Sequence, residues 1–243
     1  MRTRRGARLE GAAPMRERVA AGGRPADTRV AKNPFASRRR RPYNQARMAS
    51  PLDELIKLLR LAYSGELAAA YAYRGHWRSV RDEATRARIR EIEEEEWHHR
   101  RLVGRMLEQL GARPNRAREF RAIVIGRTLG AMCHLSGWLL PMYGAGKLES
   151  RNINEYETAA RHASRSGRAE FVECLLGMAE VEWEHEKYFR ACVANHKLGA
   201  RLPLWPSPSP KESIRAAYNV ELGAIPERVG FADDELAFES DRA

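Results

Sequence analysis

The sequence predicts an all-α protein built around an antiparallel four-helix bundle. Apolar residues recur at steps of three and four from Pro51 to about residue 195, and this is the period of an amphipathic helix. The sequence shows neither the alternating pattern of β-strands nor an internal repeat of roughly 20–50 residues. With 243 residues, 43% of them hydrophobic, the chain suits one domain with tails.

The net charge of the chain is concentrated near its N-terminus. Residues 1–48 hold 14 of the 43 basic residues and 3 of the 32 acidic ones, so the remainder holds 29 of each. The formal charge of +11 therefore belongs to the tail and not to the predicted bundle. Three cysteines are too few for a disulfide scaffold, which favours a reducing compartment.

Residues 1–48 are expected to form a disordered, Arg-rich tail, because they contain few apolar side chains that could be buried. Three interpretations stay open. The tail could be an arm that binds nucleic acid or an anionic membrane, a mitochondrial transit peptide, or a segment that is not translated if synthesis begins at Met48. We expect a cytoplasmic protein, with a peripheral membrane or a mitochondrial location as alternatives.

Turn residues set the expected boundaries of the helices. Gly111 and Pro114 end the second helix, and residues 164–167 form a turn before the fourth. The four expected helices span residues 51–81, 85–110, 146–164 and 168–195. The predicted bundle occupies residues 49–197. A Pro-rich linker and a loose C-terminal tail follow over residues 198–243, with a short helix near 211–220.

Residues 116–140 form an apolar stretch whose end is marked by Pro141 and two glycines. Residues 128–146 carry no formal charge over 19 positions, which is close to the length of a membrane span. The segment also contains His134, Ser136 and four glycines. We therefore favour a buried or interfacial segment over a transmembrane helix.

Two Glu-x-x-His pairs, Glu96/His99 and Glu182/His185, carry the chemical information in the sequence. A spacing of three places both side chains of a pair on one face of a helix. Each pair interrupts an apolar stripe, where solvated charges are not expected. A buried carboxylate needs a counter-charge, and a metal ion supplies one.

The remaining Glu-x-x-His pair and the arginines of the same helix bear on this interpretation. A third pair, Glu95/His98, shares its helix face with charged and polar residues and is predicted to face solvent. The alternative to a metal site is a set of ordinary amphipathic helices whose acids pair with arginines such as Arg100 and Arg101.

Each of the other two helices offers a carboxylate on its apolar face. In the first helix it is Glu66; in the third the candidates are Glu149, Glu155 and Glu157. In an antiparallel helical hairpin, two residues that lie opposite each other are equally far from the turn along the sequence. Glu66 and Glu96 are centred on the break near residue 81, and Glu149 and Glu182 are centred on the 164–167 turn. Glu157 would place that centre inside the fourth helix, so Glu149 is predicted.

The predicted ligands are Glu66, Glu96, His99, Glu149, Glu182 and His185. This is the ligand set of a carboxylate-bridged di-iron or di-manganese centre in a helical bundle. Oxygen ligands with two imidazoles favour two Fe ions, with Mn as the alternative, and the ligand types also admit zinc.

Tyr73 and Tyr156 lie on the ligand-bearing faces. They are predicted to be catalytic residues that donate hydrogen bonds or electrons near the metals, and the alternative is that they are core residues with satisfied hydroxyls. The cysteines at 133, 174 and 192 are interpreted as small buried hydrophobic residues or as residues without a functional role.

The ligand order resembles that of the ferritin-like superfamily. Within it, Ser64-Gly65-Glu66-Leu67, and Glu96-x-x-His99 followed by Gly111-Ala112-Arg113-Pro114, resemble the demethoxyubiquinone hydroxylases of ubiquinone biosynthesis. The resemblance covers about residues 52–192, and Tyr63-Ser64 stands where that family usually has Asp-His. It implies that the six predicted ligands bind iron, that the apolar 120–145 region contacts a membrane peripherally, and that a quinone-like substrate enters from that side.

The expected function is that of a di-iron, O2-dependent monooxygenase acting on a hydrophobic substrate. Because the sequence lacks a dinucleotide fingerprint, a reductase, a reduced quinone or a nicotinamide must supply two electrons per cycle. The alternatives are a ferroxidase or peroxide-scavenging protein of ferritin or rubrerythrin type, a di-iron tRNA hydroxylase, and a helical interaction module without metal. Nucleic-acid binding is the less favoured expectation, and a homo-oligomer is left open.

Overall fold

The computed structural model describes residues 49–225, and this part of the chain is helical throughout and contains no strand. Its long helices are α1 (Pro51–Ser79), α2 (Glu83–Gln109), α3 (Arg116–Cys133), α4 (Leu139–Arg165) and α5 (Val172–Ala194). Two single 3-10 turns, η1 (Ala169–Phe171) and η2 (Gly199–Arg201), flank α5, and α6 (Glu212–Leu222) ends the described chain. The predicted all-α class is confirmed. The predicted tails at 1–48 and 226–243 lie outside the described residues.

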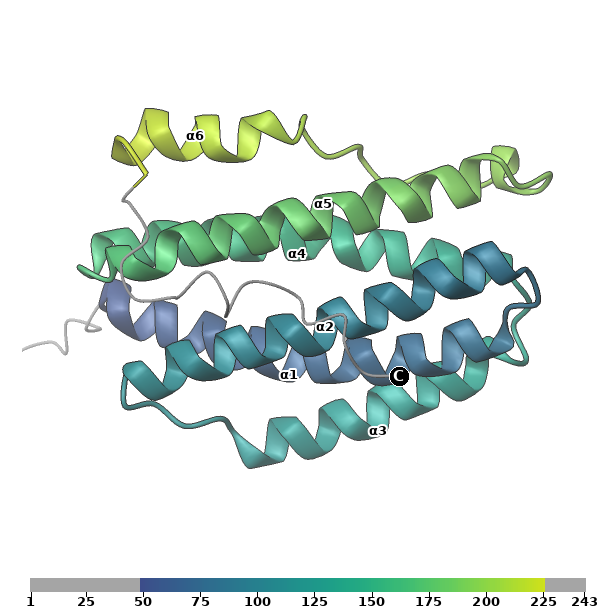
Figure 1. Cartoon of the computed structure of the whole chain (residues 1–243), viewed down its shortest axis with the longest axis horizontal. Helices are drawn as coiled ribbons and strands as arrows, with labels where there is room; N and C mark the ends of the chain where they lie inside the picture. Colours follow the sequence, from purple (N-terminus) through teal and green to yellow (C-terminus); the bar gives the residue numbers. More distant parts are fainter. Residues whose placement is uncertain (1–48, 226–243) are drawn as a thin grey trace, which may run out of the picture. The chain divides into compact units, whose positions relative to one another are not determined.

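Two antiparallel hairpins form the bundle. Helix α1 packs against α2, and α4 packs against α5, as Figure 1 shows. Local sequence fixes the helix ends. Ser50 and Asp53 form a reciprocal capping box at the start of α1, and the Asp82 side chain accepts from the backbone N–H of Thr85 at the start of α2. Gly111 follows α2 with φ +63°, a backbone conformation that favours glycine.

The apolar stretch at 116–140, for which no helix boundaries were predicted, forms α3 and the turn after it. Helix α3 lies along the outside of α1 (Figure 1). Glycines allow this close packing: a Cβ added to Gly75 would lie 2.3 Å from the Cα of Gly130, and one added to Gly126 would lie 2.4 Å from the carbonyl oxygen of Ala68. None of the helices between residues 49 and 225 combines the length and apolarity that a membrane crossing requires.

Helix α4 begins earlier than predicted. The expected start near Gly146 is wrong, because the helix begins at Leu139 and includes Pro141 and two glycines in its first turns. A proline is tolerated there since the N–H groups of a first helical turn have no partner within the helix. The short helix predicted near 211–220 is present as α6. Arg215 attaches α6 to α5 by donating hydrogen bonds to the carboxylates of Glu173 and Glu180.

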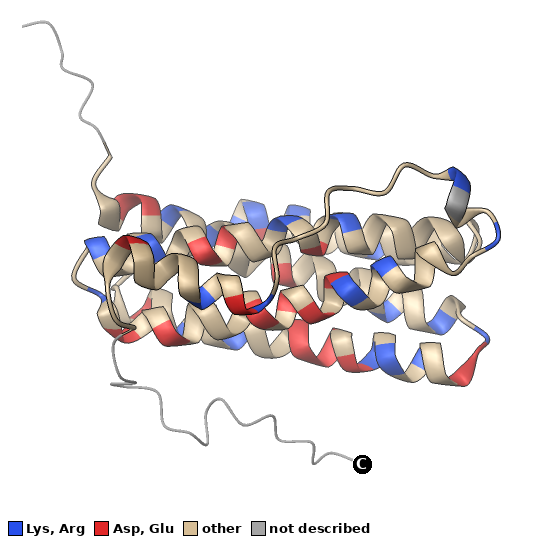
Figure 2. Cartoon of the chain, turned by 90° about the horizontal axis from the view of Figure 1, so that it is seen from above, with Lys and Arg blue, Asp and Glu red and all other residues tan. Residues whose placement is uncertain are grey.

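The buried core consists of two apolar clusters. One contains Leu59, Val103 and Leu175, and the other contains Tyr73, Ile92 and Phe189. Along α1, α2 and α5 the residues between these clusters include the predicted ligands. The apolar core is therefore interrupted by a polar layer near the middle of the bundle. Figure 2 shows residues of both charge signs spread along the helices, in keeping with the balanced charge of this part of the sequence.

Candidate metal centre

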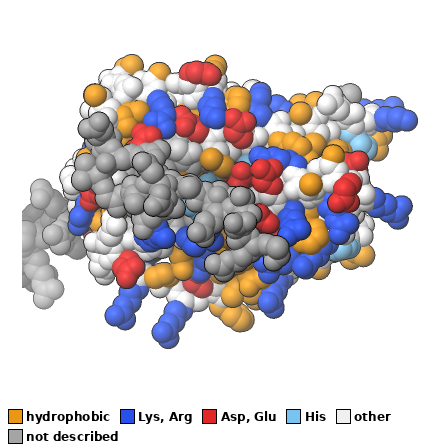
Figure 3. Space-filling model, in the orientation of Figure 1, with side chains coloured by type: hydrophobic (Ala, Val, Ile, Leu, Met, Phe, Trp, Pro, Cys, Tyr) orange, Lys and Arg blue, Asp and Glu red, His pale blue; other side chains and the backbone are white. Residues whose placement is uncertain are grey.

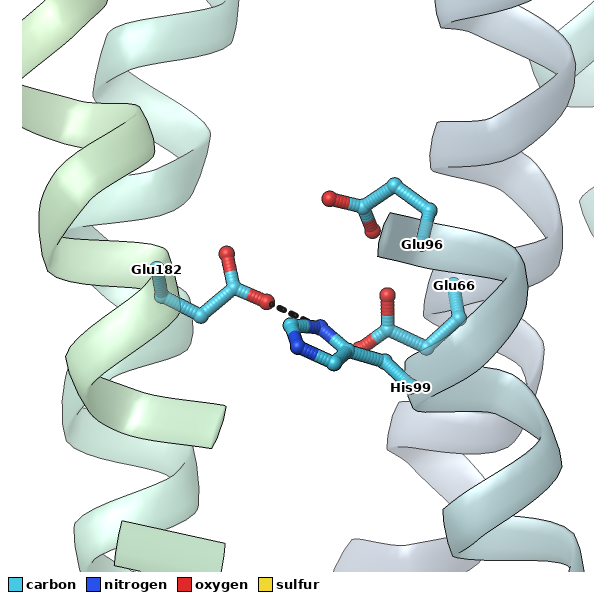
Figure 4. Close-up of side chains that lie close together, drawn as sticks. All are labelled: Glu66, Glu96, His99 and Glu182. Atoms are coloured by element: carbon cyan, nitrogen blue, oxygen red, sulfur yellow. Dashed lines mark hydrogen bonds and ion pairs between the residues drawn. The ribbon is translucent and has the colours of Figure 1, made fainter. Parts of the chain in front are cut away.

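The structure brings all six predicted ligands together inside the bundle. Glu96, Glu149, Glu182 and His185 have no exposed surface, and Glu66 and His99 are 3% and 2% exposed. Such burial is unusual for carboxylates. Figure 4 shows Glu182 extending from α5 toward the side chains of Glu66, Glu96 and His99, which come from α1 and α2.

The six side chains fall into two overlapping groups, each with ligand atoms within 4.8 Å of one another. The first group consists of Glu66, Glu96, His99 and Glu182, and the second of Glu96, Glu149, Glu182 and His185. Glu96 and Glu182 belong to both groups. Each group thus offers one carboxylate and one imidazole of its own, together with two carboxylates that it shares with the other. This is the arrangement expected of two ions joined by bridging carboxylates.

Several ligand atoms in this layer have no hydrogen-bond partner. They are one oxygen of Glu66, both oxygens of Glu96 and the Nδ1 of His185. The Nδ1 of His185 lies 3.5 Å from Glu96 Oε1 and 3.6 Å from Glu182 Oε2. Buried polar atoms are seldom left unpaired. The unpaired atoms and the donor set therefore fit metal ions held at this position.

The electrostatics of the layer also call for cations. Burial raises the pKa of Glu66, Glu96 and Glu149, and neighbouring carboxylates raise it further for Glu96 and Glu149. Burial has the same tendency at Glu182, but the imidazoles of His185 and His99 outweigh it and hold that pKa below its usual range. Without cations the carboxylates must retain protons, and bound metal ions would replace those protons.

Two tyrosines hydrogen-bond to the predicted ligands. The hydroxyl of Tyr73 donates to Glu149 Oε1, and that of Tyr156 donates to Glu66 Oε1. Each hydroxyl therefore binds a carboxylate that is not shared: Glu149 belongs only to the group with His185, and Glu66 only to the group with His99. The predicted hydrogen bonds are present, and a part in electron transfer stays a prediction.

The interpretation of Glu95 as a solvent-facing residue is wrong. Its side chain is 26% exposed, and its carboxylate lies 2.6 Å from the Nε2 of His185. Arg88 lies 3.3 Å from the same carboxylate. Burial opposes a charge on His185, but the carboxylates of Glu182 and Glu95 raise its pKa to about 9. A carboxylate that fixes the ring of a ligating histidine in this way strengthens metal binding.

Asn152 contacts two of the predicted ligands, and it was not among the residues that the sequence predicted at the site. Its amide nitrogen donates to Glu149 Oε2 at 2.8 Å and lies 3.5 Å from Glu182 Oε2. The signal was its position three residues after Glu149, on the same face of α4. Of the rival acids on α4, Glu157 instead pairs with Arg161 at 3.2 Å.

The arginines that could have neutralised the acids have other partners. Arg100 donates to Glu119 and to the backbone oxygen of Tyr63, and Arg101 lies 3.4 Å from the Nδ1 of His98. None of the three cysteines forms a disulfide. Cys174 is buried as expected, whereas Cys133 and Cys192 are only partly buried.

Two cavities lie between α1, α3 and α4, beside the polar layer. The larger, of about 390 Å³, is lined by Tyr73 and His76 and by apolar side chains of α3 and α4. The smaller, of about 210 Å³, reaches Glu66 and Tyr156. Leu129 and Leu148 line both cavities and are themselves 47% and 42% exposed. The two cavities thus lie between exposed leucines and the predicted ligand layer.

Comparison with known proteins identifies a family. Residues 53–161 match the family of the ubiquinone biosynthesis protein COQ7. The segment includes Glu66, Glu96, His99 and Glu149 and ends before Glu182 and His185. The match confirms the resemblance to the demethoxyubiquinone hydroxylases of the ferritin-like superfamily. No curated protein and no solved structure gives a match.

Proposed function

From its match to this hydroxylase family of ubiquinone biosynthesis, we propose that the chain is a di-iron, O2-dependent monooxygenase that hydroxylates a hydrophobic, quinone-like molecule. One observation carries the proposal: two buried ligand groups that share Glu96 and Glu182 lie beside apolar cavities open to the surface. Two iron ions held there would supply the chemistry that activates O2, with Mn as the alternative metal.

The surrounding residues position the predicted ligands. Tyr73 and Tyr156 hold the carboxylates of Glu149 and Glu66 by hydrogen bonds, while Glu95 orients the ring of His185. Asn152 spans Glu149 and Glu182. These contacts reduce the freedom of side chains that must hold their positions while substrate enters.

The apolar cavity walls favour an organic substrate over free iron as the substrate. A ferroxidase needs a polar path for iron, whereas Leu129 and Leu148 line both cavities beside the ligand layer. The walls exclude water around a bound aromatic ring. Because two electrons must enter in each cycle, an external donor is part of the proposal, either a reductase or a reduced nicotinamide or quinone that reacts directly.

Peripheral membrane contact through residues 120–145 is a further part of the proposal. Several apolar side chains there are exposed; they include Phe120 at 68%, Leu135 at 88% and Leu140 at 60%. Figure 3 shows hydrophobic side chains gathered along the lower edge of the molecule, where Figure 1 places α3. Exposed apolar patches of this kind are typical of interfaces. Sedimentation of the chain with anionic lipid vesicles, compared with a Leu135→Asp variant, tests this contact.

The metal content of the anaerobically purified full-length chain tests the centre. We expect about two iron ions per chain and an absorbance change on exposure to air. Glu182→Ala should lose both ions because Glu182 belongs to both ligand groups. Glu149→Ala should retain the ion that is held by the group with Glu66 and His99. Full metal content in the Glu182 variant would refute the assignment.

Product analysis then separates the candidate functions. With a reductant, O2 and a short-chain methoxy-benzoquinone, we expect a hydroxylated ring that carries one oxygen atom from 18O2. Rapid iron oxidation or peroxide consumption without a hydroxylated product would instead favour the ferritin or rubrerythrin type. Hydroxylation of tRNA, abolished by deletion of residues 1–47, would favour the RNA-modifying alternative.

A further inference from the structure

The larger cavity between α1, α3 and α4 has a buried polar side chain that the proposed chemistry does not use. This is His76 of α1, which is 2% exposed and lines the cavity. It belongs to neither ligand group. Its Nε2 is buried and has no hydrogen-bond partner.

Aromatic neighbours hold the imidazole of His76 in place. Its ring stacks on Phe189, with a centroid distance of 6.2 Å and an interplanar angle of 17°, and on Tyr73, with 6.4 Å and 22°. Phe189 and Tyr73 also stack on each other, at 5.7 Å and 5°. Tyr73 and His76 line the cavity, and Tyr73 also donates a hydrogen bond to Glu149, so this side of the cavity lies next to the predicted metal centre.

The imidazole of His76 is uncharged at neutral pH, since burial lowers its pKa to about 4. A neutral imidazole has one nitrogen that donates and one that accepts a hydrogen bond. The rest of the cavity wall is mainly apolar, with Leu129, Met132 and Leu140 on the side toward the surface. The cavity therefore has a hydrogen-bonding group at its inner wall and apolar side chains toward its outer side, which suits a ligand with an oxygen-bearing ring and an apolar tail.

We propose that His76 is a substrate-recognition residue, which hydrogen-bonds to an oxygen on the ring of an amphipathic quinone or phenol whose tail extends past Met132 and Leu140 toward the surface. The inference rests on the proposed function, because it identifies the position that the substrate ring would take beside the ligand layer. It adds a residue that selects the ring by its oxygen atoms and not by its shape.

The test compares two probes on the iron-loaded full-length chain by titration calorimetry. One probe is decyl-1,4-benzoquinone, and the other is decylbenzene, which has the same tail and lacks the ring oxygens. His76→Phe keeps the stacked ring and removes both nitrogens. We expect it to weaken binding of the quinone about tenfold, as for loss of one buried hydrogen bond, and to leave decylbenzene binding unchanged.

Two further variants serve as controls. His76→Gln restores a donor and an acceptor, so its affinity for the quinone should stay within about threefold of the wild type. Met132→Leu changes the apolar wall alone, so it should not alter the preference for the quinone over decylbenzene. If His76→Phe does not fold, as judged by its melting transition, His76→Leu takes its place.

Equal affinity of the wild type and His76→Phe for the quinone would overturn the inference and leave the proposed hydroxylase intact. A wild-type chain that binds no quinone would overturn both the inference and the quinone-like substrate. Iron content and O2 consumption, measured on the same samples, report on the metal centre independently of either result.

Discussion

The burial of His76 has a consequence for stability that can be measured separately from function. In the unfolded chain its imidazole takes up a proton near pH 6.5, whereas in the folded chain it does so only near pH 4. Between these values the unfolded state binds more protons, so acidification destabilises the folded state. The change to make is His76→Phe, which keeps a ring against Phe189 and Tyr73 and removes the titrating group.

The size of the effect follows from the two pKa values. Between pH 8 and pH 5, protonation of His76 in the unfolded chain should lower the unfolding free energy of the wild type by about 2 kcal/mol. The Phe variant should not show this loss. Urea unfolding at several pH values, followed by circular dichroism, measures the difference. A chelator in every sample removes metal binding as a variable, and the carboxylates of the ligand layer titrate alike in both proteins.

Two outcomes would contradict this reasoning. Equal losses of unfolding free energy in the two proteins would mean that His76 is protonated in the folded state without cost. A larger loss in the variant would mean that the imidazole stabilises the acid form. A loss about 2 kcal/mol smaller in the variant supports the assignment of a buried, neutral imidazole.

Three other changes test contacts described above. Glu95→Ala should weaken metal retention about 10- to 100-fold by releasing the ring of His185; competition with a chelator measures this, and Glu94→Ala, at a more exposed position of the same helix, is the matched control. Gly130→Leu should lower the unfolding free energy by about 1–3 kcal/mol because α3 must move away from α1, and an unchanged denaturation midpoint would contradict the close packing. Arg215→Ala should cost about 1 kcal/mol and speed proteolysis around α6, since its ion pairs attach α6 to α5; cleavage at the wild-type rate would exclude that role.

The ligand layer was predictable because its signal is local. Glu96 and His99 interrupt an apolar stripe, and this pattern fixes their burial without any knowledge of the partner helices. The choice of Glu149 followed from hairpin geometry, which needs only the position of the turn. The family match over residues 53–161 includes Glu149 as well as Glu66, Glu96 and His99.

Contacts between helices were not predictable in this way. Whether Glu95 reaches His185 depends on the rotation of α2 relative to α5, which no local pattern encodes. The close approach of Gly75 and Gly130 likewise depends on where α3 crosses α1. His76 has no distinctive sequence context, because its significance comes from a cavity to which α1, α3 and α4 all contribute.

The division of the ligand layer between two hairpins bears on how the chain folds. Glu66 and Glu96 belong to the α1–α2 hairpin, and Glu149 and Glu182 belong to the α4–α5 hairpin. Each hairpin can form from contacts between neighbouring segments, which is a fast process. Four carboxylates meet only when the hairpins associate, so electrostatic repulsion is greatest at that step. We therefore expect metal ions to accelerate the association of the two hairpins and to have little effect on the formation of either hairpin alone.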